Sequence, residues 1–285
     1  MNRLFVFGCS FTYYIWPTWA DFLAEEYEHY ENWGISGIGN RAIFNRLIEF
    51  STTHKITKDD TVIIQWSSHL RNDFYTPNKI DDYRNLNWKT YGSLFNYHNQ
   101  NLYGSKWIKT FFHEPAYLYE TLNYISAAQQ LLENTNCNWF MTSMGDIQKL
   151  NTDLPQIIIG YENEDSSNKI FDEFTNYIKP IFEDKKSNWI VPIGSFCNRE
   201  EDYWNINGID PHPHPFAQVR WLNENLMPKL NKQPSINQEL WLQSINDAKE
   251  KAGNNKKLFE HILFSEHDTL KYWPNNVWPG PYYGY

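Results

Sequence analysis

Short apolar runs alternate along the chain with longer stretches of helical periodicity. The runs at 3–8, 29–33, 61–66, 138–142 and 189–193 predict five strands. In the third run Val62, Ile63 and Ile64 follow one another without a polar residue. A continuous β-branched run of this kind is typical of a parallel strand that is buried on both faces.

Helices are predicted between these strands by apolar residues three and four positions apart. The groups are Trp19, Phe22 and Leu23 after Pro17, then Ile43, Leu47 and Ile48, then the stretches 117–132, 170–182 and 215–230. Strands that alternate with helices predict an α/β fold, with a mostly parallel five-stranded sheet covered on both faces. In such folds ligands bind at the carboxyl edge of the strands.

Two stretches depart from this alternation. Residues 70–113 are polar, aromatic and irregular, and a connection of this length is usually functional, so we interpret it as an insertion that forms a lid or pocket wall. Near the C-terminus a helix is predicted over 236–251, followed by an irregular aromatic tail over 258–285 that wraps a surface. We expect a main domain over 1–230 and a C-terminal extension over 231–285.

The charge balance argues against nucleic acid as a partner. The chain has 25 Lys and Arg against 34 Asp and Glu, a formal net charge of -9, and no cluster of basic residues that would offset it. The first apolar run is too short for a signal peptide or a membrane span. Three cysteines without CxxC spacing indicate no disulfide framework. We expect a cytoplasmic protein without a membrane partner, although a virion-associated protein would need no signal either.

Ser10 is the first candidate for chemistry. It directly follows the first predicted strand, in Phe7-Gly8-Cys9-Ser10, at the edge where ligands bind. A serine hydroxyl becomes a good nucleophile only beside a base, typically a histidine oriented by a third group. Asp210 and His212 supply both in Asp-Pro-His-Pro-His, which its prolines hold extended before a predicted helix. The sequence therefore predicts a Ser-His-Asp triad.

These residues resemble a known family. Gly-Cys-Ser-Phe-Thr near the N-terminus, the Asn- and Gly-rich loop over 32–40 and Asp-x-His-Pro before the last core helix are similar to the motifs of SGNH (GDSL-type) hydrolases, in the same order over roughly 3–230. The resemblance implies a flavodoxin-like three-layer fold and ester hydrolysis without a cofactor. It also implies that Ser10 is the nucleophile, that His212 with Asp210 is the base, and that the N–H groups of Ser10 and Gly37 bind the oxyanion.

The chain departs from the family pattern at two places. Cys9 stands where the family has Asp before the serine, and we interpret it as a small buried residue. The family's Gly-x-Asn after the third strand, whose amide also binds the oxyanion, is replaced by Ser67-Ser68-His69. Asn40 or Ser67 are candidates for the missing donor. Asn72 and Asp73 lie too far past the strand to be assigned.

The aromatic content points to a substrate class. Aromatic residues make up 18% of the chain, with 13 Trp and 19 Tyr, so some rings are expected to face a ligand, and such rings suit the apolar faces of sugars. We therefore expect an esterase that removes a small acyl group, such as acetyl, from a carbohydrate or another small molecule.

Three alternatives remain open. One is a glycan-binding or structural module on a degenerate hydrolase scaffold, and the second is an acyltransferase that uses the same triad. The third is a metal site, because Asp210, His212 and His214 alternate along an extended segment and suit zinc or iron. No further ligand cluster accompanies those three residues in the sequence, so no metal is expected.

Overall fold

The structure is a computed structural model. It describes residues 2–75, 88–93, 106–107, 110–147, 174, 176–198, 200–205, 209–234 and 238–266, without the side chains of 89–93, 205, 209–211, 260 and 264–266.

Four parallel strands form the central sheet, in the order β2-β1-β3-β6. Their bounds are β1 (Arg3–Phe7), β2 (His29–Asn32), β3 (Asp60–Trp66) and β6 (Asn138–Ser143). The strand order reverses at β1, as it does in flavodoxin-like folds, and this reversal creates the crevice in which such folds bind ligands. The predicted α/β fold is therefore confirmed, and the turn that follows β1 lies at this reversal.

The predicted fifth strand is only partly present. Residues 189–192 run beside β6, with one parallel bridge between Met141 and Trp189, and the N–H of Ile190 donates to the carbonyl of Met141 at 2.8 Å. Pro192 has no N–H to extend this pairing, and Ile193 already begins the short helix α6 (Ile193–Phe196). The segment lies where the sequence predicts it, but regular strand pairing stops after one bridge.

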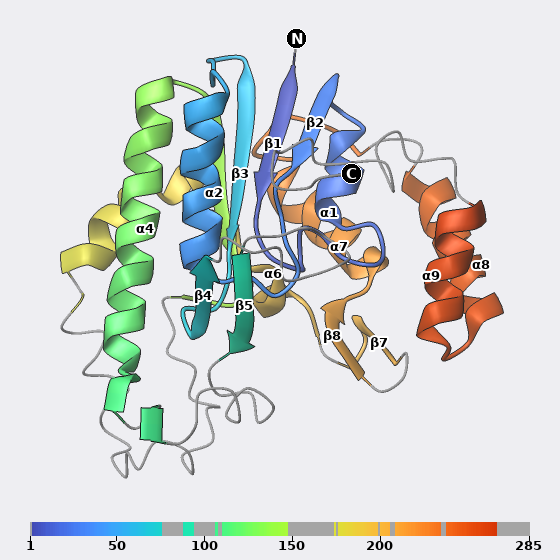
Figure 1. Ribbon diagram of the computed structural model, residues 1–285. Coiled ribbons are helices and arrows are strands. Elements are labelled where there is room, and N and C mark those ends of the chain that lie inside the picture. The colour runs from blue at the N-terminus through green and yellow to red at the C-terminus, as the bar shows by residue number, and fades with distance from the viewer. Residues whose placement is uncertain are drawn as a thin grey trace.

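Helices cover both faces of the sheet (Figure 1). On one face α2 (Asn40–Thr53) packs against α4 (Glu114–Thr135). On the other face α1 (Trp19–Ala24) packs against α7 (Pro215–Trp221), which continues into the π-helix η4 (Leu222–Leu226). Two further short helices follow in the chain: η2 (Lys179–Glu183) packs against α4, and η3 (Lys186–Asn188) contacts β6. These layers make the predicted three-layer α/β/α arrangement.

Two small antiparallel hairpins lie at the carboxyl end of the sheet (Figure 1). One pairs β4 (Arg71–Tyr75) with β5 (Trp88–Ser93), and the other pairs β7 (Tyr203–Asn205) with β8 (Ile209–Pro213). The prediction that 70–113 is irregular is wrong for its described first part, because β4 and β5 form an antiparallel ladder, with one register shift between Arg71 and Asp73. Residues 76–87 and 94–105 lie outside the described residues, so the predicted lid remains a prediction.

The C-terminal region folds as two helices, α8 (Gln238–Ala252) and α9 (Lys256–Glu266). The first confirms the helix predicted over 236–251. The second shows that the prediction of an irregular tail from residue 258 onward was wrong for the described part. The apolar residues of this helix have helical spacing, and three of them are buried in the main core: Phe259, Ile262 and Leu263. Residues 267–285 lie outside the described residues.

Much of the aromatic surplus is core. The largest fully buried side chains include Trp16, Trp19, Trp33, Trp66 and Trp221. These five rings are fully buried, so they do not face a ligand. Exposed rings are found on β4, at Phe74 and Tyr75.

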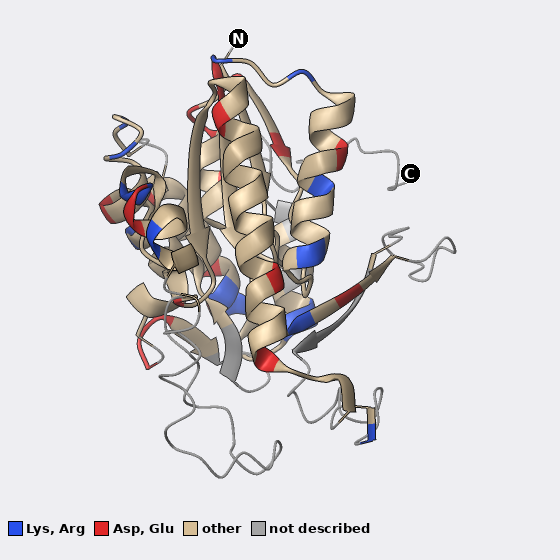
Figure 2. Ribbon diagram, turned by 90° about the vertical axis from the view of Figure 1, so that its left-hand side faces the viewer, with Lys and Arg blue, Asp and Glu red and all other residues tan. Residues whose placement is uncertain are grey.

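Charged residues are dispersed. In Figure 2 the Lys and Arg residues are spread over several elements and mixed with Asp and Glu. Among the described residues, none of the helices has both the length and the apolar character that crossing a membrane requires.

Candidate active site

Ser10 lies at the carboxyl end of β1, where the sequence predicts it. The residues after β1 form a tight turn in which the carbonyl of Cys9 accepts from the N–H groups of Thr12 and Tyr13, at 3.0 and 3.2 Å. The serine is thus presented by a turn and not by a helix, since α1 begins only at Trp19. Ser10 is 3% exposed and Cys9 is fully buried, as expected for a small residue behind the site.

His212 reaches Ser10 from the other end of the chain. Its Nε2 lies 2.8 Å from Oγ of Ser10, a hydrogen bond between residues 202 positions apart. This is the geometry in which an imidazole accepts the proton of a serine hydroxyl. Asp210 belongs to the same strand, β8, but its side chain is outside the described part of the structure. Its role as the orienting carboxylate therefore stays a prediction.

Two aromatic rings hold the imidazole. Tyr14 stacks on His212 with ring centroids 3.8 Å apart and planes 26° apart, and Phe11 meets it edge-on at 5.5 Å. Both rings come from the loop that carries Ser10, so the nucleophile and its partner histidine are fixed by one segment. Sequence reasoning missed this role of Phe11 and Tyr14.

The loop after β2 runs beside the Ser10 turn. The amide of Asn32 donates to the carbonyl of Thr12 at 2.6 Å, and Oγ of Ser36 donates to the carbonyl of Tyr13 at 2.9 Å. Gly37 follows with φ of 84°, in the left-handed region that favours glycine. Within the described part of the chain, the N–H groups of Ser10 and Gly37 donate to no protein acceptor.

Asn40 links the start of α2 to Ser67, after β3, and to Thr121 of α4. Its Nδ2 donates to the carbonyl of Ser67 at 3.0 Å and to Oγ1 of Thr121 at 3.1 Å, and its Oδ1 accepts from the N–H of Ser67 at 2.7 Å. Both amide hydrogens are thus engaged within the protein, which argues against Asn40 as the missing oxyanion donor. The Oγ of Ser67 is buried and has no partner among the described residues, so Ser67 is the better candidate of the two.

Side chains of strand β4 form hydrogen bonds with the loop that carries Gly37 and with the start of α2. Asp73 is fully buried, and its carboxylate accepts from the N–H groups of Gly39 and Ala42 at 2.8 and 3.1 Å. Arg71 donates to the carbonyl of Ile38 at 3.0 Å. A Cβ on Gly39 would come within 2.7 Å of Cβ of Arg71, so this close approach requires glycine. The sequence offered no signal for these contacts, because they depend on how β4 folds back over the loop.

His214 caps a helix. Its Nδ1 accepts from the N–H of Ala217 at the start of α7, and its Nε2 faces the carbonyl of Glu201, both at 3.0 Å. Burial is the main cause that lowers the pKa of His214 below its usual value. Both ring nitrogens are therefore occupied, which disfavours the metal alternative. Among the described residues no cluster of three or more His, Cys, Asp or Glu side chains could hold a metal ion.

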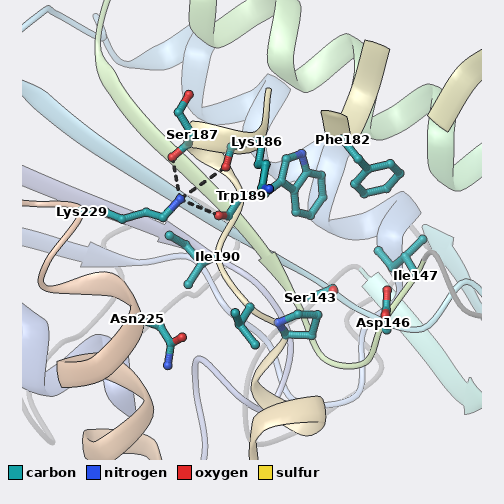
Figure 3. Close-up of a pocket in the computed structure, with 12 residues that line it drawn as sticks. Ser143, Asp146, Ile147, Phe182, Lys186, Ser187, Trp189, Ile190, Asn225 and Lys229 are labelled. Carbon is teal, nitrogen blue, oxygen red and sulfur yellow. Dashed lines mark hydrogen bonds between the residues drawn. The ribbon is translucent and has the colours of Figure 1, made fainter. Parts of the chain in front are cut away.

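Two cavities flank the sheet. A polar cavity of about 130 Å³ lies beside Asn40, between the start of α2 and α4, and Arg41, Arg71 and Glu120 contribute to its walls. A larger cavity of about 630 Å³ lies beyond β6 (Figure 3). None of the candidate site residues lines the larger cavity, and Lys229 at its edge is engaged with three backbone carbonyls, those of Lys186, Ser187 and Trp189.

Comparisons with known proteins give structural likeness without sequence likeness. No protein-family model and no curated protein sequence matches the chain. Among solved structures, a GDSL-like lipase from Bacteroides thetaiotaomicron is 12% identical over 87% of this chain and 89% of its own, with a TM-score of 0.39. TesA is 16% identical over 80% of this chain and 98% of its own, with a TM-score of 0.42. The psychrotrophic esterase EstA from Pseudoalteromonas sp. is 13% identical over 85% of this chain and 100% of its own, with a TM-score of 0.40.

Proposed function

We propose that this protein is a serine esterase that removes a small acyl group from a hydroxylated substrate. The observation that carries the proposal is the 2.8 Å contact between Nε2 of His212 and Oγ of Ser10, at the carboxyl end of β1. A buried serine and a histidine so placed, at the point where the strand order reverses, suit nucleophilic acyl transfer.

In the first half-reaction Oγ of Ser10 attacks the ester carbonyl carbon while Nε2 of His212 takes the hydroxyl proton. The carbonyl π electrons move to oxygen, and the N–H groups of Ser10 and Gly37 bind the resulting oxyanion, with Oγ of Ser67 as a third donor. His212 then gives its proton to the leaving alkoxide, and an acyl-serine remains.

In the second half-reaction water replaces the alcohol. His212 takes one proton from the attacking water, a second tetrahedral oxyanion forms, and the proton returns to Oγ of Ser10 as the acid departs. If a sugar hydroxyl takes the place of water, the same steps give acyl transfer. Asp210, two residues before His212, would stabilise the imidazolium in both halves.

Exposed aromatic rings support a carbohydrate as the hydroxylated substrate. Phe74 is 37% exposed and Tyr75 is 49% exposed, both on β4, and Tyr75 packs edge-on against Trp88 of β5. The same strand contacts the Gly37 loop through Arg71 and Asp73. Phe74 and Tyr75 are consecutive strand residues and point to opposite faces of the hairpin, and Tyr75 shares its face with Asp73. A ligand that lies on Tyr75 is thus recognised by a strand that is fixed to the site. Aromatic faces suit the C–H faces of sugar rings, and acetyl is the acyl group that we propose.

The enzymatic claim is tested with p-nitrophenyl acetate and a fluorophosphonate probe. We expect turnover by the wild type, a loss of at least ~10³-fold in Ser10→Ala and His212→Gln, and probe adducts that mass spectrometry maps to Ser10. Ser51→Ala, on an exposed helix face, is the matched control. Equal turnover in the wild type and Ser10→Ala would reject the serine mechanism. Glycan binding that survives in Ser10→Ala, with no labelling of the wild type, would select the binding module.

The carbohydrate claim needs a separate comparison. Tyr75→Ala should lower kcat/KM on acetylated oligosaccharides by about tenfold, the size of one lost stacking contact, and leave turnover of p-nitrophenyl acetate unchanged. Phe111→Ala, which removes another exposed ring, serves as the control. Equal losses on both substrates would contradict sugar recognition by β4. Release of acetate that accelerates with added sugar acceptor would indicate transfer in place of hydrolysis.

A further inference from the structure

The C-terminal helix α9 contacts the loop that carries the nucleophile. Nζ of Lys256 donates to Oη of Tyr14 at 3.1 Å, across 242 positions in the sequence. The ring of Tyr14 in turn stacks on His212 with centroids 3.8 Å apart. Tyr14 therefore lies between Lys256, from the last described helix, and the imidazole that contacts Ser10.

An aromatic cluster makes this contact rigid. Trp16 is fully buried and meets Tyr14 edge-on at 4.5 Å, Trp204 at 5.4 Å and Phe259 at 6.2 Å. Trp204 belongs to β7, which pairs with the strand of His212, and Phe259 belongs to α9. The cluster thus joins the Ser10 loop, the His212 hairpin and α9, so Tyr14 cannot shift without disturbing buried rings.

The position of Lys256 is unfavourable for the helix alone. It is the first residue of α9, and the first turn of this helix contains no acidic residue. The N-terminus of a helix carries partial positive charge, so a cation there destabilises the helix. The hydrogen bond to Tyr14 gives this lysine a partner that local helix preference does not explain.

We propose that Tyr14 and Lys256 are positioning residues for His212, and that helix α9 belongs to the active site through them. Lys256 fixes the hydroxyl of Tyr14, and the stacked ring fixes the plane of the imidazole, so Nε2 stays directed at Oγ of Ser10. The inference rests on the proposed function in one respect only: the histidine that is held is the one that acts as base.

The test compares four single variants and the Tyr14→Phe/Lys256→Met double variant, each checked by circular dichroism for a retained fold. Tyr14→Leu removes the ring, Tyr14→Phe removes only the hydroxyl, and Lys256→Met removes only the ammonium. Lys257→Met, an exposed neighbour on the same helix, is the matched control. Two quantities are measured in each: the rate of fluorophosphonate labelling of Ser10, and the NMR chemical shifts of the His212 ring protons, which report ring-current shielding by Tyr14.

We expect Tyr14→Leu to slow labelling by about tenfold or more, as misplacement of a reacting group does, and to shift the His212 ring protons downfield. Tyr14→Phe and Lys256→Met should have smaller, equal effects, and the double variant should be no worse than either one, because both break the same hydrogen bond. Lys257→Met should match the wild type. Recovery of most of the labelling rate by Tyr14→Phe relative to Tyr14→Leu would identify the stacked ring as the main positioning element.

Two results would overturn the inference. One is that Lys256→Met matches Lys257→Met in both measurements, and the other is that Tyr14→Leu leaves the His212 shifts unchanged. If the NMR shifts follow the expected pattern while the wild type shows no labelling, the positioning contact stands and the proposed esterase function fails. The two claims are thus separated by one set of samples.

Discussion

The carboxylate of Asp73 accepts a hydrogen bond from the backbone N–H of Gly39 at 2.8 Å, and so ties strand β4 to the loop that carries Gly37. A second bond from Ala42 makes Asp73 the N-terminal cap of α2, supplied from a different element. The loop that carries Gly37 is thus held in place by strand β4.

Replacement of Asp73 by Asn should weaken both the fold and the site. The buried amide would point an N–H donor at one of two backbone N–H groups, and an unsatisfied buried donor costs about 1–3 kcal/mol of unfolding free energy. Urea denaturation measures this loss, and the labelling rate of Ser10 measures the effect on the loop. Asp59→Asn, at an exposed position, is the control. Full stability in Asp73→Asn would contradict the capping role.

A comparison of Gly37→Ala with Gly253→Ala should distinguish the effect of backbone strain on stability from the effect of Gly37 on activity. At φ of 84° an L-residue is strained, by roughly 1–2 kcal/mol in the left-handed region. Gly253, with φ of 55° at the end of α8, provides a matched variant with similar strain and no contact with the site. We expect both alanine variants to lose stability in thermal unfolding, and only Gly37→Ala to lose activity on p-nitrophenyl acetate. Similar activity in the two would argue against the oxyanion role of Gly37.

Ser67→Ala tests the third oxyanion donor. The hydroxyl has no described partner, so its removal should leave the melting temperature nearly unchanged. Loss of one oxyanion donor typically lowers kcat by about 10²–10³-fold. Ser68→Ala is the neighbouring control, whose hydroxyl accepts from the N–H of Leu70 at 3.2 Å. A wild-type kcat in Ser67→Ala would restrict the oxyanion site to backbone donors.

His214 should make stability depend on pH. Burial holds its folded-state pKa below the unfolded value near 6.5, so the unfolded chain binds the proton more readily. The stabilisation is complete above that value and is lost as pH falls through the folded pKa. His214→Asn keeps a side-chain cap without a titrating ring, and should flatten the urea-unfolding profile between about pH 7 and 5. His113→Asn, at the start of α4 where the ring makes no cap bond, is the control; the same flattening there would contradict the assignment.

Asp60 should make folding stability depend on pH in a more acidic range than His214 does. Burial by itself would raise its pKa, but hydrogen bonds from Arg3 and Thr57 outweigh burial and hold the pKa below 3.8. Its contribution is present above that value and is lost as pH falls further. Asp60→Asn should cost roughly 1.5–3 kcal/mol at pH 7, the range for hydrogen bonds to charged groups, with a difference from wild type that shrinks in acid. A difference that is independent of pH would show that the carboxylate charge is unimportant.

Local sequence patterns were enough to predict the layered fold and both ends of the site. Apolar runs and helical spacing are local patterns, and they suffice to locate β1, β3, α2, α4 and α7. Ser10 and His212 were identifiable because each follows from residue type and position beside a predicted element, and the structure brings them within hydrogen-bonding distance.

The residues that surround this pair could not be predicted, because they come from distant parts of the chain. Asp73, Tyr14 and Lys256 carry no local signal, because their roles come from contacts between segments that are up to 242 residues apart. His214 illustrates the limit in the other direction: its spacing from His212 fits a metal site, but its Nδ1 caps the start of α7 and its Nε2 faces the carbonyl of Glu201. Short-range periodicity is encoded in neighbouring residues, whereas the partner of a side chain is selected when distant elements pack together.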